Sequence, residues 1–160
     1  ISFGNALIKT VVEELKHEYP RIKHYGTLSP LLGFTKSLAA LPAVAKDGAL
    51  EDVLTLATDH IRLRKPLAAA YLSLAKRDNG TPVDPVARFH LSNGARIHQL
   101  HEDADTSARG MKQSLGMMVN YLYHPDELIE NHESFVNDGT IKADKAVKEN
   151  AQKAKPYLSL

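Results

Sequence analysis

His90 and Asn93, three positions apart, are the residues of this sequence whose types and spacing could do chemistry together. On a helical turn, side chains three positions apart lie on one face. An imidazole can donate a proton and an amide can hydrogen-bond an oxyanion, so the two could act as an acid and an electrophile. Spacing alone nevertheless favours a hydrogen-bonded core histidine beside a helix stop at Asn93-Gly94.

A proline and a glycine bound the segment that carries these two residues. Pro85 fits the first turn of a helix, because its fixed φ suits that position and its missing N–H is not needed there. The dipeptide Asn93-Gly94 tolerates positive φ and is typical of a tight turn. The sequence therefore predicts a short element that begins at Pro85 and ends at Asn93-Gly94.

Ser29 is a second candidate, and it follows a predicted strand at residues 21–28. Serine is a favoured N-cap and proline a favoured first helical residue, so Ser29-Pro30 predicts the start of a helix. The alternative is a serine hydroxyl that points from the strand end into a site.

His98 and His101 raise the question of a metal site. Their spacing could chelate an ion from a helix, but residues 96–104 alternate as a strand does, and strand positions three apart point to opposite faces. The chain has no cysteine, which excludes disulfides, thiolate nucleophiles and cysteine metal sites. We therefore expect no metal.

The elements that position these residues follow from hydrophobic spacing. An apolar stripe predicts a helix within residues 2–18, and Gly4-Asn5 at its start could favour a phosphate, with an ordinary helix start as the alternative. Residues 38–63 predict helix broken by Pro42, and residues 67–76 predict a second helix. A lysine-rich helix at residues 142–155 has a thin apolar stripe, so we expect it to pack lightly or against another subunit.

Composition is that of an ordinary globular chain. It has 160 residues, 43% of them hydrophobic and 24% charged, enough for one domain or part of one. The net charge of +1 gives no case for a nucleic-acid or membrane surface. No apolar run approaches the roughly 20 residues that span a bilayer, and no signal pattern opens the chain. We expect a cytoplasmic location.

Four segments, in order, resemble the malonyl-CoA decarboxylase family. Residues 85–95, P-V-A-R-F-H-L-S-N-G-A, are similar to the family pattern P-V-A-x-F-H-L-x-N-G-A. Residues 2–5 with the following helix resemble its CoA loop and helix, and residues 27–34, T-L-S-P-L-L-G-F, resemble its T/S-L-S-P-x-x-G-F segment. Residues 105–123 resemble D-x-S-x-R-G-x-x-x-S-x-G-x-M-x-N-Y-x-Y. Residues 38–63 and about the last thirty residues show little similarity.

The resemblance implies an α+β fold, the C-terminal portion of a GNAT-like (acetyltransferase-type) domain. A mixed sheet would be flanked by helices, with a helical excursion at residues 38–63. The chain starts at Ile1 without methionine. We therefore expect residues 1–160 to be the C-terminal part of a catalytic domain. Its partners would be a preceding N-terminal segment of the same protein and further copies in a homo-oligomer.

The resemblance also implies decarboxylation of malonyl-CoA to acetyl-CoA and carbon dioxide. The thioester is the electron sink, so no PLP, thiamine, biotin or metal cofactor is required. Ser29 would hydrogen-bond the malonyl group and share a proton. His90 would donate a proton, since its ordinary pKa of about 6.5 allows both forms near neutrality. The implied substrate-binding residues are Ser2, Phe3, Gly4, Asn5, Asn93, Arg109, Asn120 and Tyr123.

Alternatives remain at the level of residues and of function. Arg109 could instead form an ion pair with Asp105, four residues before it, and Tyr123 could be an ordinary core tyrosine. A CoA-dependent acyltransferase could use the same scaffold, although no acceptor site is visible. A non-catalytic helical binding fragment is the third possibility, and the presence of both Ser29 and His90 argues against it.

Overall fold

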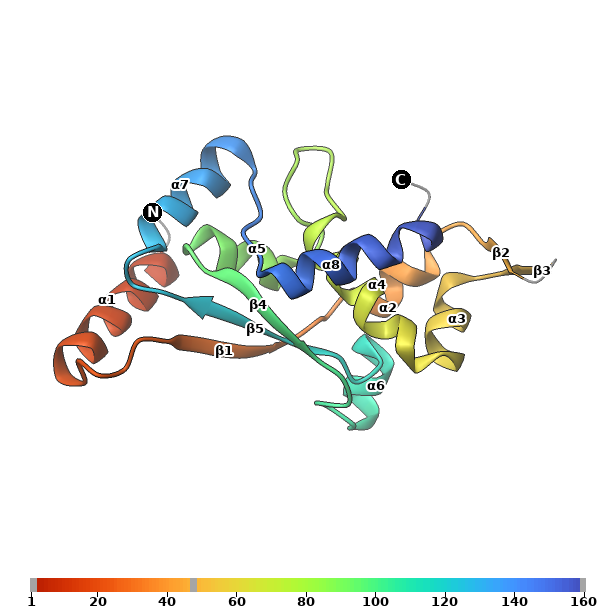
Figure 1. The fold of residues 1–160 in the computed structure, drawn as a ribbon, viewed down its shortest axis with the longest axis horizontal. Helices are drawn as coiled ribbons and strands as arrows, with labels where there is room; N and C mark the ends of the chain where they lie inside the picture. Colours follow the sequence, from red (N-terminus) through yellow and green to blue (C-terminus); the bar gives the residue numbers. More distant parts are fainter. Residues whose placement is uncertain (1–2, 47–48, 159–160) are drawn as a thin grey trace.

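A three-stranded antiparallel sheet with helices around it forms the centre of the computed structural model, which describes residues 3–46 and 49–158 (Figure 1). In chain order the elements are α1 (Phe3–Glu18), β1 (Tyr25–Pro30), α2 (Phe34–Ala39), β2 (Val44–Lys46), β3 (Ala49–Glu51), α3 (Val53–Asp59), α4 (Ile61–Ser73), α5 (Pro85–Ser92), β4 (Arg96–His101), α6 (Ala108–Ser114), β5 (Met118–Tyr123), α7 (Leu128–Asp138), α8 (Lys145–Ala154) and the 3₁₀ turn η1 (Lys155–Tyr157). The predicted α+β class is confirmed.

The sheet has the strand order β1-β5-β4, and both ladders are antiparallel, in place of the mixed sheet expected. Strands β4 and β5 are joined through α6 and pair directly with each other. A bulge between Ile97 and Gln99 shifts the register of β4. Because of this extra residue, Ile97 and Leu100 both lie on the buried face, although simple alternation predicts opposite faces.

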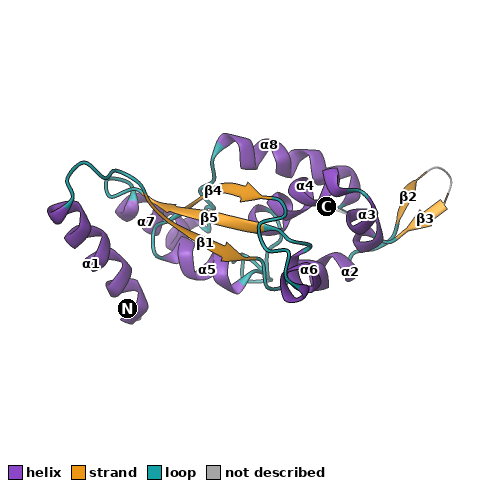
Figure 2. Cartoon of the chain, turned by 90° about the horizontal axis from the view of Figure 1, so that it is seen from below, coloured by secondary structure: helices purple, strands orange, loops and turns teal. Residues whose placement is uncertain are grey.

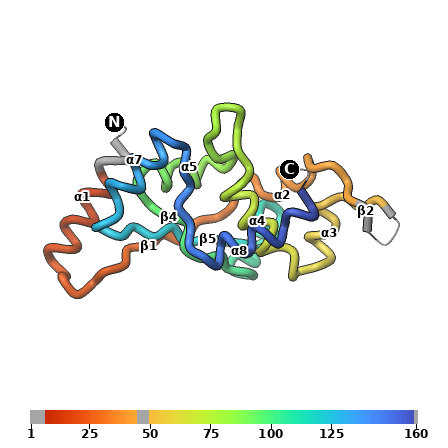
Figure 3. Tube along the Cα trace, turned by 45° about the horizontal axis from the view of Figure 1, so that its top comes forward, coloured from red at the N-terminus to blue at the C-terminus, as the bar shows by residue number. Residues whose placement is uncertain are grey.

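The helices extend the molecule beyond both ends of the sheet. Figure 2 shows α1 beyond one end and the β2–β3 hairpin at the opposite end of the molecule. Helix α8 runs along α4 (Figure 3), and Val147, Ala151 and Ala154 are buried there. The prediction that the closing helix packs lightly or against another subunit is therefore wrong, because α4 within the same chain covers its apolar stripe.

Residues 38–63 were the least accurately predicted stretch. The β2–β3 hairpin lies where helix was expected. The second helix, expected at residues 67–76, is α4, which begins earlier, at Ile61, and continues through Pro66. Residues 66–72 are buried throughout, so core packing outweighs the cost of the proline. Helix α7 was also missed. Among the described residues, no helix has the length and apolar character needed for a bilayer span.

Candidate active site

Helix α5 carries the candidate histidine and is fixed at its start by a buried aspartate. Asp84 is the N-cap, and its Oδ1 accepts a hydrogen bond from the backbone N–H of Ala87 at 2.7 Å. Its other oxygen accepts from the Tyr71 hydroxyl at 2.9 Å. Pro85 begins the helix and Asn93 caps its end, as predicted. The cap and the α4 tyrosine together set where α5 lies.

A close approach fixes the other end of α5. Gly94 has a φ of +83°, and a Cβ placed there would lie 2.2 Å from the carbonyl oxygen of Leu128 at the start of α7. Asn131 of α7 donates from Nδ2 to the Gly94 carbonyl at 3.1 Å. Glycine is therefore required both for the left-handed backbone and for the contact with α7.

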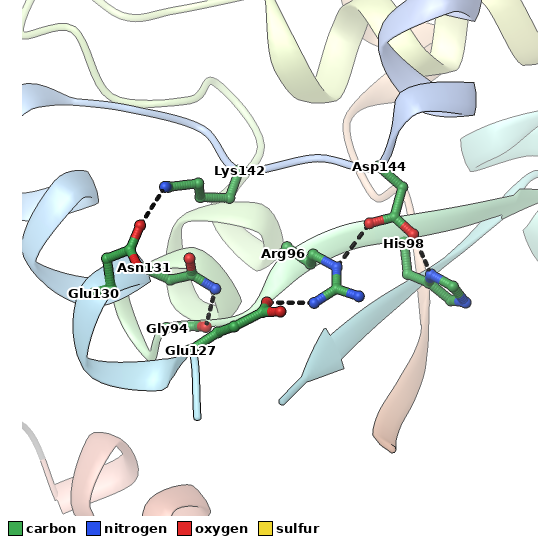
Figure 4. A network of polar contacts seen from close by, with 8 residues as sticks. All are labelled: Gly94, Arg96, His98, Glu127, Glu130, Asn131, Lys142 and Asp144. Atoms are coloured by element: carbon green, nitrogen blue, oxygen red, sulfur yellow. Dashed lines mark hydrogen bonds and ion pairs between the residues drawn. The ribbon is translucent and has the colours of Figure 1, made fainter. Parts of the chain in front are cut away.

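A polar network supports this region from the side of β4. Figure 4 shows Arg96 hydrogen-bonded to Asp144 and Glu127, with His98 on the other oxygen of Asp144. The Arg96 Nε to Asp144 Oδ1 distance is 2.7 Å, and the His98 Nδ1 to Asp144 Oδ2 distance is 2.6 Å. The network ties the start of α7 and the start of α8 to the strand that follows Gly94.

Ser29 and His90 meet in the interior. The Ser29 Oγ lies 3.2 Å from the His90 Nε2, and the two residues are 61 positions apart in the chain. Both side chains are buried, with 7% of Ser29 and 6% of His90 exposed. Ser29 lies inside β1, paired with Val119 of β5, and α2 begins only at Phe34 with Gly33 as its N-cap. The predicted helix start at Ser29-Pro30 is therefore wrong, and the hydroxyl points from the strand into the site.

Two tyrosines of β5 complete the surroundings of His90. The Tyr123 hydroxyl lies 2.5 Å from the His90 Nδ1. The Tyr121 ring stacks on the imidazole, with ring centroids 4.3 Å apart and planes inclined by 19°. In an antiparallel sheet, directly paired residues share a face, and Tyr121 pairs with Thr27 while Val119 pairs with Ser29. The face of the sheet under α5 therefore carries Ser29, Thr27, Tyr121 and Tyr123.

The hydrogens of Tyr123, His90 and Ser29 each have an acceptor in one arrangement of this cluster. Burial raises the pKa of the Tyr123 phenol, so it keeps its proton and donates to Nδ1 of His90. The single proton of the neutral imidazole then sits on Nε2 and is donated to Ser29. The Ser29 hydroxyl donates to Thr27 Oγ1 at 3.5 Å. A chain of four groups thus runs from Tyr123 through His90 and Ser29 to Thr27.

His90 is neutral at physiological pH. Desolvation by burial lowers its pKa from 6.5 to about 4. Burial disfavours the charged form, and Ser29 and Tyr123 supply no negative charge to offset it. The expectation that both forms coexist near neutrality is therefore wrong, and the buried ring is held in its neutral form.

The structure places the other predicted site residues in different surroundings. Asn93 is fully buried at the end of α5, where its Nδ2 donates to the Phe89 carbonyl. Asn120 lies on the sheet face opposite His90, because it is one residue from Tyr121 in β5; it contacts His101 and donates to the Thr27 carbonyl. It is therefore not brought together with His90.

Arg109 has no hydrogen bond or ion pair to Ser29 or His90 among the described residues, and the side chains of the amino-terminal residues are not described. Arg109 is exposed on α6, where its Nε donates to Gln113, and none of the ion pairs between described residues joins it to Asp105. Phe3, Gly4 and Asn5 form the first turn of α1, and only their backbone is described. Ser2 lies outside the described residues.

An apolar groove of about 530 Å³ lies between α1 and β1, and Thr27 and Tyr123 are among its lining residues. Both residues belong to the hydrogen-bond chain described above. The lining residues are Leu7, Ile8, Val11, Val12, Leu15, Ile22, His24, Tyr25, Gly26, Thr27 and Tyr123.

Sequence reasoning missed Asp84 and Thr27 as parts of the site, and it did not include Tyr121 among the binding residues although the tyrosine lies in a segment that could close the pocket. The alternation of β5 contained a usable signal, because Tyr121 and Tyr123 are two apart and must share a face, while Asn120 must face away. Asp84 directly precedes Pro85 and is a favoured N-cap residue. Thr27 and Ser29 are also two apart, so extending the predicted strand by one residue would have placed both on one face.

Comparison with known proteins identifies related chains. A family model described as the malonyl-CoA decarboxylase C-terminal domain matches residues 1–159. The chain is 31% identical to a protein of Anser anser anser named malonyl-CoA decarboxylase, mitochondrial, over 92% of this chain and 36% of that protein. It is 29% identical to the protein of the same name from Rattus norvegicus, over 92% of this chain and 37% of the relative. The chain thus spans little more than a third of these relatives' length.

Solved structures show the same architecture. The crystal structure of malonyl-CoA decarboxylase from Cupriavidus metallidurans superposes with a TM-score of 0.80 at 36% identity, covering 94% of this chain and 44% of that one. The structure from Rhodopseudomonas palustris gives a TM-score of 0.77 at 41% identity, covering 94% of this chain and 38% of that one. The fold described above is consistent with the C-terminal part of a GNAT-like domain, as predicted.

Proposed function

The chain belongs to the malonyl-CoA decarboxylase family, and we propose that it supplies the Ser–His pair that decarboxylates malonyl-CoA to acetyl-CoA and carbon dioxide. One observation carries this proposal. Ser29 Oγ and His90 Nε2, 61 positions apart, lie 3.2 Å from each other in the interior. A buried contact between a hydroxyl and a neutral imidazole, at the end of an apolar groove, suits a reaction that needs one shared proton and little water.

The chemistry requires a sink for one electron pair and a source of one proton. When the C–C bond to the carboxylate breaks, its electron pair passes into the thioester carbonyl and forms an enolate as carbon dioxide leaves. The enolate carbon then takes a proton, which gives acetyl-CoA. The thioester serves as the sink, so we expect no cofactor and no metal.

Ser29 and His90 act as one unit in this scheme. The Ser29 hydroxyl hydrogen-bonds the malonyl group and delivers its proton to the enolate carbon. His90 replaces that proton from Nε2–H, while the Tyr123 hydroxyl donates to Nδ1 and stabilises the ring as it loses its own proton. Solvent returns the proton to the chain of groups after carbon dioxide has left.

The groove between α1 and β1 is our proposed path for the acyl thioester. It is apolar, and its lining includes Thr27 and Tyr123, which contact Ser29 and His90. The family resemblance assigns Ser2, Phe3, Gly4 and Asn5 to the CoA loop, and the last three of these begin α1, the helix that lines the groove. Asn93, Arg109 and Asn120 remain predicted binding residues only, and Asn120 is the weakest of them because it contacts His101 on the opposite face.

The relatives are much longer than this chain, so the remaining wall of the pocket is proposed to come from a preceding segment of the same protein. A homo-oligomer and a cytoplasmic location also stay predictions. The curated names of the relatives from Anser anser anser and Rattus norvegicus place those proteins in mitochondria. Fractionation of the source cells would decide the compartment.

The test is turnover of malonyl-CoA by the complete protein, followed as carbon dioxide release. We expect the Ser29→Ala and His90→Ala variants each to lose at least about 10²-fold in kcat, the usual contribution of a positioned acid or base. The double variant should lose little more than either single one, because groups that act as a unit are not additive. Normal turnover in either single variant would remove that residue from the mechanism.

Matched controls separate catalysis from folding. Ser92→Ala removes a serine of α5 whose hydroxyl bonds only the nearby Phe89 carbonyl, and His17→Ala removes an exposed histidine in the last turn of α1. Both should keep wild-type turnover, and all four single variants should keep the wild-type circular-dichroism spectrum. Acyl transfer to an added amine without carbon dioxide release would instead support the acyltransferase alternative.

A further inference from the structure

Tyr121 lies flat against the face of His90 at the centre of the sheet. The two ring centroids are 4.3 Å apart and the planes differ by 19°, whereas Phe89 and Tyr123 meet the imidazole at 75° and 66°. Tyr121 is fully buried in β5, the strand with neighbours on both sides. Its backbone is therefore held by a paired residue on each side, Thr27 of β1 and Ile97 of β4.

The hydroxyl of Tyr121 does not explain why this ring is there. Within the described part of the chain, that oxygen is buried without a hydrogen-bond partner. A buried hydroxyl without a partner costs stability, so the ring must provide the favourable interaction. Its position beneath the imidazole indicates what that interaction is.

We propose that Tyr121 is a positioning residue for the reaction, whose ring fixes the plane of the His90 imidazole and excludes water from its underside. The inference rests on the proposed function. The outer torsion of a histidine side chain has broad minima, so a ring held only at its edge can rotate. Offset stacking favours one plane. In that plane Nε2 faces Ser29 and Nδ1 faces Tyr123.

The surroundings of His90 explain why covering one face matters for its protonation. The groups that face it are Ser29 of β1, Tyr121 and Tyr123 of β5, and Phe89 of its own helix. The carboxylate of Asp84 lies at the opposite end of α5 and is engaged by Tyr71 of α4. Burial, rather than a charged neighbour, keeps the imidazole neutral. Removing the ring below it admits water and raises the pKa toward its ordinary value.

The experiment compares Tyr121→Phe, which keeps the ring and loses the hydroxyl, with Tyr121→Leu, which keeps an apolar side chain and loses the ring. In the complete protein, Y121F should hold kcat within about twofold of wild type. Y121L should lower kcat at least about tenfold with little change in KM, because substrate contacts remain while the reacting geometry loosens. The acid limb of its pH profile should move upward.

A second readout does not depend on turnover. NMR titration of the His90 ring protons in the same variants should show a pKa raised by about one unit or more in Y121L and unchanged in Y121F. If wild type releases no carbon dioxide, the proposed function fails, and this titration still decides whether Tyr121 controls the imidazole. Should Y121L not fold, Y121M provides a ring-free side chain of greater reach.

Three results would overturn the proposal. An unchanged His90 titration in both ring-free variants would show that the stacked ring does not control protonation. An equal loss of kcat in Y121F and Y121L would assign the effect to the hydroxyl instead. A lowered unfolding midpoint with unchanged kcat and unchanged titration would leave Tyr121 a purely structural residue.

Discussion

The imidazole of His90 is stabilised in its neutral form by burial between a helix and a sheet, and this couples its titration to the stability of the fold. Its pKa is lowered from 6.5 to about 4 when the chain folds. Between these two values the unfolded chain binds a proton at this residue and the folded chain does not. Above pH 6.5, His90 is neutral in both states and does not lower the free energy of unfolding. As the pH falls from 6.5 toward 4, the unfolded chain gains a proton that the folded chain does not, so the free energy of unfolding decreases.

The loss of stability in acid predicts how a variant without the imidazole should behave. Going from pH 7.5 to pH 5 should cost wild type about 2 kcal/mol of unfolding free energy through His90 alone. The His90→Gln variant should lack that component. Urea unfolding of both proteins at the two pH values measures the difference. Equal losses in the two proteins would mean that His90 is not held neutral by the fold.

The contact between Ser29 and His90, the proposed catalytic pair, could not be predicted from residue spacing. His90 and Asn93 share a local segment, yet the partner that contacts the imidazole is Ser29, 61 positions away. Only the resemblance to a family connected the two residues. The assignment of Ser29 as a helix cap was a local inference, and it failed because pairing with Val119 extends β1 through Pro30.

Among the elements, α5 is the one whose ends were best predicted from sequence, because both ends depend on local chemistry. Asp84, Pro85 and Asn93-Gly94 act through the backbone of neighbouring residues, so short patterns identify them. The β2–β3 hairpin and α7 had no comparable signals. Alanine- and leucine-rich residues suit helix by propensity, and the strands of the hairpin have only three residues each.

Gly94 and Gly80 form a matched pair for testing what holds the end of α5. Both have positive φ, +83° and +77°, but a Cβ on Gly94 would meet the Leu128 carbonyl at 2.2 Å, and a Cβ on Gly80 meets nothing within 4 Å. Gly80→Ala should therefore cost only the backbone strain, about 1 kcal/mol. Gly94→Ala should cost about 3 kcal/mol or more, since α7 must also move.

Chemical denaturation of the two glycine variants supplies the comparison, and turnover adds a second measurement. Displacing the end of α5 should also disturb His90, so Gly94→Ala should lose activity at temperatures where it remains folded. Similar destabilisation by both substitutions would mean that α7 can move away from Gly94 at little cost in free energy.

Across the whole molecule, the polar network around Asp144 connects elements that are distant in sequence. Partial burial acts to raise the pKa of Asp144, but hydrogen bonds from His98 and Arg96 outweigh it and hold the pKa below its ordinary 3.8. A carboxyl with a depressed pKa stabilises the fold above its ordinary pKa, and this contribution is lost as the pH falls through the folded value. The network should therefore stabilise the fold at neutral pH and lose this effect in strong acid, when Asp144 is protonated.

The Asp144→Asn variant tests how much the Asp144 carboxylate stabilises the fold at pH 7. It leaves Arg96 and His98 without their carboxylate, so we expect a loss of about 2–4 kcal/mol in unfolding free energy. The control is Glu149→Gln, whose partner Lys145 is largely exposed and whose removal should cost less than about 0.5 kcal/mol. Urea titrations at pH 7 and pH 3 should show the difference between wild type and Asp144→Asn shrinking in acid. A constant difference would assign the effect to packing.

Ser29 and His90, the two members of the proposed catalytic pair, are not held equally firmly by the fold. Within the described residues, Ser29 belongs to an outer strand that pairs on one side with β5, while His90 is fixed by α5 and by two tyrosines of the central strand. On heating, fraying of that outer strand would carry the serine away while the helices stay intact. Enzymatic inactivation would then precede the loss of ellipticity, and the gap between the two temperatures would report how loosely β1 is attached.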